Sequence, residues 1–389
     1  MPTQNNYRIK GTTFMFNYDA KIKKFCEKKV TLSSDMRAML LAHRKANADR
    51  IIARIPEFHP KIWVGESNFR SQGGFAMDTV IQTRFLSEEY DIDYGLVIRR
   101  SQLFNEDDSE MTAEQVKELI RDVLKDDRFK RQPRIMHNCV RVFYAEEDDY
   151  KHHVDFPIYR EFEDADENTT REIAGEAGWG ISNPTRVNEW LEDLVAEKNR
   201  LQAGAGTQMR QMIKLLKRFS RSRIDWDMPN GMKLTMLTAE CAHYSERDDE
   251  AFYLLLAALK TRLAGNLVIE NLADESFPKS KITKTSQDQN VINLRDKVGE
   301  GLDALKVLFD PQCQQADARR GWDWVFQSDG FFKEIEDAEK AEAKRQDLLA
   351  KASLITSGRA VTTPVGRIAA AGACGVSNAA HSFYGAVVS

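Results

Sequence analysis

Two aspartates separated by one residue carry the most specific chemical signal in this sequence. Asp91 and Asp93 lie in a stretch that is typical of a β-strand, where alternate side chains emerge on the same face. Ile92 and Tyr94 then point to the other face, into a core. Adjacent carboxylates repel each other unless a cation lies between them, and oxygen ligands suit a hard ion such as Mg²⁺. The spacing therefore predicts a divalent-metal site.

A third carboxylate, Asp155, follows a strand-like segment at 135–144 and an acidic turn at 146–150. In its own segment, Val154 and Phe156 share one face and Asp155 lies on the other. A hairpin beside the Asp91 strand would bring Asp155 to the same ions. Three acids from two neighbouring strands can hold two ions about 3.5–4 Å apart, the arrangement used for in-line displacement at phosphorus. The alternative is a strand end with solvated acids, which accounts for most isolated Asp-X-Asp pairs.

A glycine pair and a basic helix supply candidate phosphate ligands. Gly73 and Gly74 form a turn that can bring bare backbone amides against a phosphate. The helix expected over 207–221 has one apolar side and one basic side, which includes Lys214 and Lys217. A charged helix face is usually only solvated. If this face is turned toward the acids, it can hold a triphosphate tail, and the whole set predicts a metal–nucleotide site.

Histidine and cysteine residues near Asp155 raise the alternative of a zinc site. His137 and Cys139 share a strand face, and His152 and His153 could lie opposite them. Their spacing matches no established zinc pattern. Packing in the core or in the hairpin is therefore the favoured interpretation of these four residues.

Hydrophobic periodicity predicts the elements that must position the site. A long helix, capped by Ser33 or Ser34, runs to about Arg54 and is ended by Pro56 and Pro60. A second helix covers 112–127. Strand, helix, strand and strand in one small unit indicate an α+β core with a mixed sheet.

The second half of the chain is predicted to be mainly helical. Residues 160–176 are polar and loop-like, and Asn230 stands at the start of one of the helices that follow. An exposed helix is expected over 334–353, and the composition after Ser357 indicates a flexible tail. The expected domains are a catalytic core with its N-terminal helix at 1–165, a helical nucleotide-binding domain at 166–333, and the exposed helix with the tail at 334–389.

Composition excludes several classes of protein. The net charge of −4 gives no global nucleic-acid footprint, so no stable nucleic-acid partner is expected. Five scattered cysteines indicate a reducing compartment without disulfides. The start of the chain has no apolar signal region, and the longest apolar run, 251–269, is interrupted by Lys260 and Arg262. We therefore expect a cytoplasmic protein without a membrane span.

The residues that carry the chemistry also carry a resemblance. Gln72-Gly73-Gly74, Asp91-Ile92-Asp93 and Val154-Asp155-Phe156 resemble the motifs of the polymerase-β-type nucleotidyltransferase superfamily. The finer pattern is similar to the bacterial cGAS/DncV-like nucleotidyltransferases (CD-NTases) of CBASS anti-phage defence, over roughly residues 35–332. Its supporting features are DIDYG at 91–95, the segment from Trp179 through Ser182-Asn183-Pro184 to Trp190, the lysine-rich helix around Lys217, and GWDWVFQSDGFF at 321–332. The resemblance implies a polymerase-β-like core with a mixed sheet, a long N-terminal helix and a C-terminal helical domain.

The resemblance also implies residue roles. Asp91 and Asp93 correspond to ligands of two Mg²⁺ ions, for which Mn²⁺ can substitute, and Asp155 to a ligand of the ion that activates the attacking hydroxyl. Nucleotide binding is implied for six residues: Gln72, Gly73, Gly74, Lys214, Lys217 and Asn230. Many relatives carry serine where Gly74 stands, and often serine in the place of Asn230.

The implied activity is synthesis of a cyclic di- or trinucleotide second messenger from NTPs, including ATP. In some such operons a ubiquitin-like pathway conjugates the enzyme's C-terminus to targets, and the small-residue tail ending at Ser389 is compatible with such partners. Three alternatives stay open: a template-independent polymerase acting on RNA ends, a non-catalytic RNA- or partner-binding protein, and a nucleotidyl-modifying toxin or antitoxin. Base choice, ring size, linkage, activation trigger and oligomeric state are left open.

Overall fold

A computed structural model describes residues 15–85, 87–144, 151–164, 167–183, 185–363, 366–370 and 376–377. The chain divides into two units, Met1–Gln327 and Ser328–Ser389. The α+β class predicted from the sequence is confirmed. None of the helices in the described ranges is long and apolar enough to cross a membrane.

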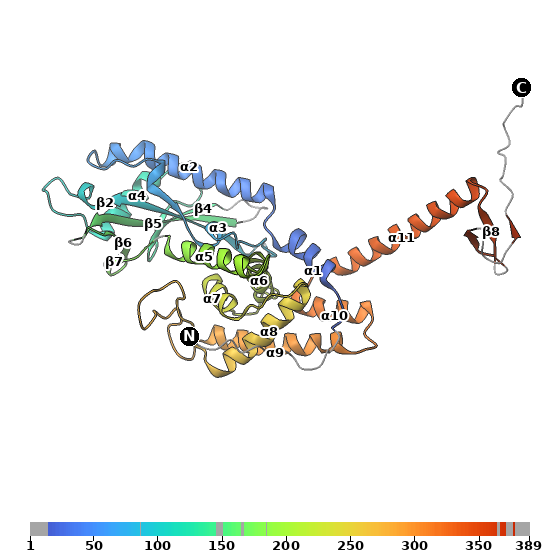
Figure 1. Ribbon diagram of the computed structural model, residues 1–389. Helices are drawn as coiled ribbons and strands as arrows, with labels where there is room; N and C mark the ends of the chain where they lie inside the picture. The colour runs from blue at the N-terminus through green and yellow to red at the C-terminus, as the bar shows by residue number, and fades with distance from the viewer. Residues whose placement is uncertain are drawn as a thin grey trace, which may run out of the picture. The chain divides into compact units, whose positions relative to one another are not determined.

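A seven-stranded mixed sheet forms the centre of the first unit (Figure 1). Its strands are β1 (Phe69–Ser71), β2 (Glu89–Arg99), β3 (Arg134–Ile135), β4 (Cys139–Tyr144), β5 (Lys151–Glu163), β6 (Thr169–Gly175) and β7 (Gly178–Ile181). The order is β1-β2-β5-β4-β3, and β6 pairs with β5 and with β7. Strands β2 and β5 are parallel, whereas β4 and β5 form an antiparallel pair. The expected hairpin beside the Asp91 strand is therefore present, although its turn, 145–150, lies outside the described residues.

Two helices, α2 (Ser34–Phe58) and α4 (Ala113–Leu124), supply the apolar side chains that bury one face of the sheet. Ile92, Val154 and Phe156 are fully buried in this core. Because side chains alternate along a strand, the aspartates next to them emerge on the opposite face.

The expected end of α2 is wrong by one turn. The helix continues through Pro56 to Phe58 and closes with the bond from His59 N to Ile55 O. Pro56 cannot donate an N–H to Ile52 O, but the helix continues for two further residues, so one missing bond in its last turn does not end it.

The prediction that residues 160–176 form a loop is also wrong. Strand β5 continues to Glu163 and β6 pairs with it in antiparallel register, so the sheet extends beyond residue 165. Charged side chains at the surface of this strand pair form ion pairs instead of a core, for example Arg171 with Glu161. A strand pair that is stabilised by ion pairs lacks the alternating hydrophobic pattern from which strands are predicted.

The rest of the first unit is helical. Its helices are α1 (Asp19–Phe25), α3 (Gly73–Ala76), α5 (Arg186–Leu201), α6 (Ala205–Ser220), α7 (Gly231–Cys241), α8 (Asp248–Gly265), α9 (Gln289–Leu305) and α10 (Gln315–Phe326). Helix α6 is buried along most of its length. The burial includes Lys214, Lys217 and Arg218, so the interpretation of a solvated basic face is wrong for these three residues.

The second unit contains the helix α11 (Phe331–Thr356) and three short strands. Most of α11 beyond Glu336 is exposed, as expected. The strands β8 (Ala360–Thr362), β9 (Ile368–Ala370) and β10 (Val376–Ser377) pair in the order β10-β8-β9. The expectation of a tail without structure is therefore not met over these residues, whereas 378–389, including the proposed conjugation end, lie outside the described residues.

Candidate active site

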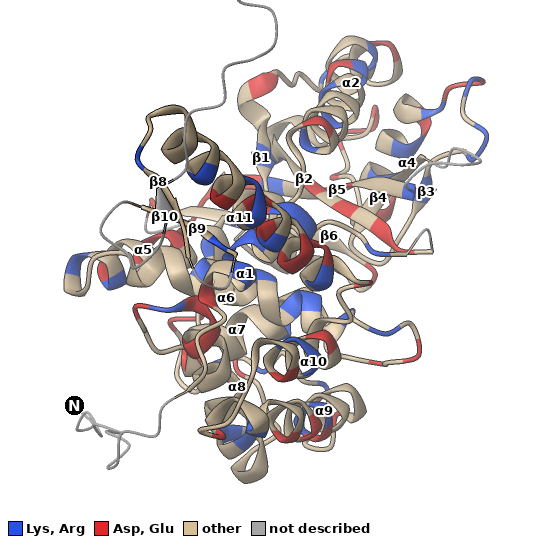
Figure 2. Ribbon diagram, turned by 90° about the vertical axis from the view of Figure 1, so that its right-hand side faces the viewer, with Lys and Arg blue, Asp and Glu red and all other residues tan. Residues whose placement is uncertain are grey.

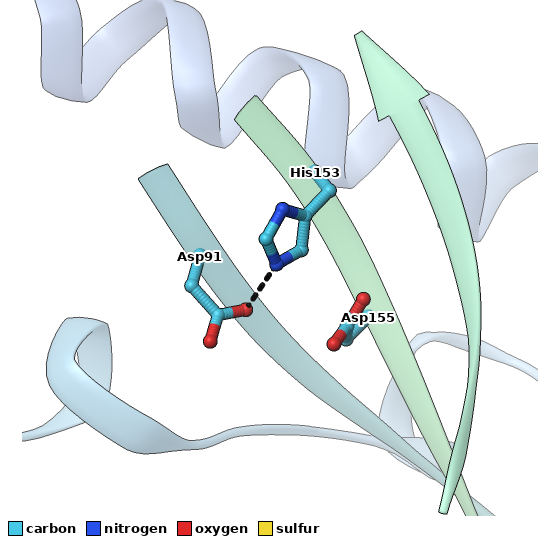
Figure 3. Close-up of side chains that lie close together, drawn as sticks. All are labelled: Asp91, His153 and Asp155. Atoms are coloured by element: carbon cyan, nitrogen blue, oxygen red, sulfur yellow. Dashed lines mark ion pairs between the residues drawn. The ribbon is translucent and has the colours of Figure 1, made fainter. Parts of the chain in front are cut away.

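The three predicted carboxylates come from the two parallel strands at the centre of the sheet. The register of β2 and β5 places Asp91 opposite His153 and Asp93 opposite Asp155. Oxygen or nitrogen atoms of Asp91, His153 and Asp155 lie within 4.8 Å of one another (Figure 3). The strand alternation inferred from the sequence therefore brings these acids together on one face.

Asp93 lies against the glycine turn. Burial, together with the charges of Asp91 and Asp155, raises the pKa of Asp93 to about 7. At Gly73, where φ is +60°, an added Cβ would lie 2.1 Å from Asp93 Oδ2. Only a residue without a side chain leaves room for this carboxylate. The structure therefore gives a steric explanation for glycine at position 73, which the sequence alone did not reveal.

Basic groups already contact two of the three acids. Arg141 donates to both oxygens of Asp155, with Nε–Oδ1 at 2.7 Å and Nη2–Oδ2 at 2.6 Å. His153 Nε2 lies 3.0 Å from Asp91 Oδ1, at ion-pair distance but without hydrogen-bond alignment. Burial lowers the pKa of His153, but contact with Asp91 and the nearby charges outweigh it, so the pKa is raised overall.

The donor set fits a hard divalent cation. Its core is carboxylate oxygen, which Mg²⁺ and Mn²⁺ prefer. A cation between Asp91, Asp93 and Asp155 would also relieve the repulsion that raises the pKa of Asp93. Because Arg141 uses both oxygens of Asp155, metal binding through that residue requires the guanidinium to share or release one oxygen.

A pocket of about 280 Å³ opens beside the acids. Six of the predicted site residues border it: Gly73, Gly74, Asp91, Asp93, Lys217 and Asn230. The first turn of α7 also borders it through Gly231 and Met232. Backbone N–H groups at a helix N-terminus are ready donors for an anion, so this pocket joins a carboxylate site to a phosphate-type site.

Lys217 reaches this pocket from the buried helix α6. Its Nζ donates to Thr79 O at 3.0 Å and to Thr79 Oγ1 at 2.8 Å. Burial, together with the nearby charges of Arg221 and Lys214, lowers the pKa of Lys217 to about 7. No carboxylate among the described residues pairs with it, so a bound polyanion would be its main counter-charge.

Asn230 has two roles in the geometry. As the N-cap of α7, its Oδ1 accepts a hydrogen bond from Lys233 N at 3.1 Å. It also stands at the wall of the pocket. The side chain therefore fixes the helix terminus that faces the site.

Two predicted nucleotide-binding residues do not border the pocket. Gln72 is buried, its Nε2 donates to Tyr159 Oη at 3.1 Å, and it packs where Gly95 has no side chain. Lys214 Nζ lies 3.2 Å from Asp78 Oδ2. Both are placed to support the glycine turn and the segment that follows it, and a direct nucleotide contact for either stays a prediction.

The zinc alternative does not assemble within the part of the chain that the structure describes. The β4–β5 register pairs Cys139 with Pro157 and Tyr144 with His152, at opposite ends of the hairpin. His137 pairs instead with Glu176, at 2.7 Å. Burial and the charge of Asp155 raise the pKa of the Cys139 thiol, which disfavours a thiolate ligand.

Sequence reasoning missed three residues of the site. Arg141 lies directly opposite Asp155 across the hairpin, so counting the register would have found it. His153 shares the strand face of Asp155, so the same alternation places it beside Asp91; from the sequence it is considered only as a possible zinc ligand. Thr79 borders the pocket without any local motif, and only the tertiary structure brings it there. Arg221, which belongs to the basic face expected for the helix over 207–221, also borders the pocket.

Comparisons with known proteins agree with this geometry. Residues 67–159 match the family model described as cyclic GMP-AMP synthase DncV-like, nucleotidyltransferase domain. Among curated proteins, no sequence matches the chain.

Solved structures share the fold at low sequence identity. The Vibrio cholerae DncV cyclic AMP-GMP synthase in complex with a linear intermediate has a TM-score of 0.62 and 15% identity, over 80% of this chain and 96% of that one. The Bradyrhizobium diazoefficiens CD-NTase CdnG in complex with GTP has a TM-score of 0.56 and 16% identity, over 82% and 97%.

The family match covers the glycine turn, β2 and the Asp155 strand, and the structural matches extend the shared fold over most of the chain. The resemblance stated from the sequence is therefore confirmed. Residues 67–159 match the DncV-like nucleotidyltransferase domain, and most of the chain shares the fold of the DncV and CdnG structures.

Proposed function

We propose that this protein joins NTPs, including ATP, into a cyclic di- or trinucleotide, using Mg²⁺ held by Asp91, Asp93 and Asp155. One observation carries the proposal: Asp91 and Asp93 of β2, with Asp155 opposite Asp93 on β5, lie at a pocket whose other walls are a glycine turn, a buried lysine and a helix N-terminus, and Asp91 and Asp93 border it directly. This is the combination that transfer of a nucleotidyl group needs, because its transition state gathers negative charge that must be positioned and balanced.

In this mechanism the acceptor 2′- or 3′-oxygen forms a bond to the α-phosphorus, and the bond from that phosphorus to the pyrophosphate breaks. When bound, Mg²⁺ would lower the pKa of the acceptor hydroxyl and would offset the negative charge of the leaving pyrophosphate. Asp91, Asp93 and Asp155 would hold the cations. The glycine turn, the α7 N-terminus and Lys217 bind and orient the phosphates. No protein nucleophile takes part.

The wider role follows from the relatives. The matched Vibrio cholerae enzyme is described as a cyclic AMP-GMP synthase, and one of its structures holds a linear dinucleotide intermediate. We extend to this chain the synthesis of a second messenger for CBASS anti-phage signalling, in which the linear product turns round and reacts again in the same pocket. A C-terminal conjugation pathway would act on the tail and not on this site.

Product analysis tests the proposal. Purified protein is incubated with all four NTPs and Mg²⁺ or Mn²⁺, treated with phosphatase, and analysed by mass spectrometry. We expect a phosphatase-resistant cyclic oligonucleotide from the wild type and from Asp49→Asn, a control on the exposed face of α2. Labelled RNA primers in parallel reactions test the rival polymerase. Primer extension without a resistant product would contradict the proposal.

A further inference from the structure

An imidazole stands beside the three acids on the same face of the sheet. The register of β2 and β5 places His153 opposite Asp91 and Asp155 opposite Asp93, and side chains two residues apart on a strand share a face. Ligand atoms of Asp91, His153 and Asp155 lie within 4.8 Å of one another (Figure 3). A cation that contacts these two carboxylates would therefore lie within reach of the ring.

The two nitrogens of His153 have different surroundings. Nδ1 lies 3.2 Å from Glu89 Oε2. Because an ionised carboxylate only accepts hydrogen bonds, this contact requires a proton on Nδ1. Nε2 points toward the aspartates and lies 3.0 Å from Asp91 Oδ1 (Figure 3). A ring held by a carboxylate at one nitrogen, with the other nitrogen directed at acidic groups, is the usual arrangement of a metal-binding histidine.

Nε2 is buried and has no hydrogen-bond partner among the described residues. The His153 side chain is only 8% exposed. A buried polar atom without a hydrogen bond is destabilising unless another interaction satisfies it, and coordination of a cation is such an interaction. The neighbouring His152 differs, because its ring lies 2.7 Å from His43 Nδ1 and not beside the acids.

The spacing of the donor atoms agrees with coordination of one ion. Neighbouring ligands of an octahedral cation, each about 2.1 Å from it, lie about 3.0 Å apart, which matches Nε2 and Asp91 Oδ1. Arg141 donates to both oxygens of Asp155. An ionised carboxylate has about four acceptor positions, so Asp155 can share an oxygen with a cation while it accepts from Arg141.

We propose that His153 Nε2 is a ligand of the divalent cation held by Asp91 and Asp155, and that this nitrogen shifts the preference of the site from Mg²⁺ toward transition-metal ions. Mg²⁺ prefers oxygen ligands, whereas imidazole suits first-row transition metals, among which Co²⁺ binds more tightly than Mn²⁺. The inference rests on the proposed function and deepens it, because it adds a ligand and assigns metal specificity. The rival account is that His153 only orients Asp91, and it predicts no bond between metal and nitrogen.

Mn²⁺ bound to the full chain reports its own ligands. Electron spin-echo spectroscopy of Mn²⁺ detects the nitrogen nucleus of a coordinated imidazole. We expect this signal in the wild type and in His137→Asn, and its loss in His153→Asn. His137 is a matched control, since it is an exposed histidine paired with Glu176 at 2.7 Å. Asparagine at position 153 keeps a donor for Glu89 but has no atom in the place of Nε2.

Calorimetric titrations with Mg²⁺ and Co²⁺ measure the preference of the site. We expect His153→Asn to weaken Co²⁺ binding about tenfold more than Mg²⁺ binding, and His137→Asn to change neither. Glu89→Gln keeps His153 but weakens the hold on Nδ1, so it should weaken Co²⁺ binding in the same direction. The melting temperature of each variant shows whether it is folded.

Each result decides between the accounts. Bound Mn²⁺ without a nitrogen signal in the wild type, or a signal that persists in His153→Asn, overturns the inference while the proposed function stands. Equal losses of Co²⁺ and Mg²⁺ affinity in His153→Asn would assign His153 to the orientation of Asp91, with the same consequence. Failure of the wild type to bind any of the three cations would instead remove the proposed function and the inference with it.

Discussion

At the residue scale, Gly73 lies so close to the Asp93 carboxylate that position 73 has no room for a side chain. In Gly73→Ala the new Cβ would meet Asp93 Oδ2 at 2.1 Å, and alanine would also occupy a left-handed backbone position. Displacing a catalytic group by about 1 Å costs on the order of 100-fold in rate, so we expect at least that loss of NTP turnover. Gly180→Ala, where an added Cβ meets nothing within 4 Å, should retain wild-type turnover. Equal rates for both variants would contradict the steric argument.

The lowered pKa of Lys217 makes the free energy of unfolding depend on pH, and it fixes the sign of that dependence. The ordinary value is 10.5 and the folded value about 7, so between these values the unfolded chain carries a proton that the folded protein lacks. Lys217 therefore destabilises the folded protein below pH 7, where it must be buried with its charge. This destabilisation disappears as the pH rises toward 10.5.

The same lowered pKa makes NTP binding take up protons. A triphosphate favours the charged lysine, so near pH 8 we expect the wild type to take up roughly one proton more per NTP than Lys217→Arg, whose side chain stays charged. Calorimetry in buffers of different ionisation enthalpy measures this difference. Identical proton uptake by the two proteins would show that Lys217 does not meet the phosphates.

At the scale of a single element, Asn230 both caps helix α7 and lies at the end of that helix that borders the pocket. Asn230→Ala removes the bond to Lys233 N and should lower the free energy of unfolding by about 1 kcal/mol. Ser33→Ala removes the equivalent cap of α2, where Ser33 Oγ accepts from Met36 N, and should cost a similar amount. Only Asn230→Ala should also weaken NTP binding, measured by titration of each variant. A parallel loss of affinity in Ser33→Ala would attribute the effect to general stability.

The elements that the sequence predicted well share one property, which is a strong periodic contrast between faces. The alternation in Asp91–Asp93 and around Asp155 was enough to predict two strands and a common face, and Thr112 was enough to start α4. Strand β6 was missed because ion pairs such as Arg160 with Glu172 stabilise it in place of alternating apolar residues. Thr79 could not be found, since its place in the site depends on how helix α6 packs against the segment after the glycine turn.

At the scale of the whole molecule, the residues of the proposed chemistry all lie within the first unit, between Gly73 and Met232. A chain ending at Thr356 keeps the whole of that unit and α11. We therefore expect it to retain NTP turnover within about twofold of the full chain, because every residue assigned here to the phosphates or the metals is kept. A loss of turnover without a loss of folded protein would assign residues 357–389 a part in catalysis.

The central claim is that aspartates from two parallel strands form one metal–nucleotide site, and single substitutions test it most directly. Turnover of labelled NTPs is measured for Asp91→Asn, Asp93→Asn, Asp155→Asn and Asp49→Asn, together with the melting temperature of each. We expect the first three to lose product formation while remaining folded, and Asp49→Asn to match the wild type. Wild-type-like product formation by any of the first three variants would contradict the account.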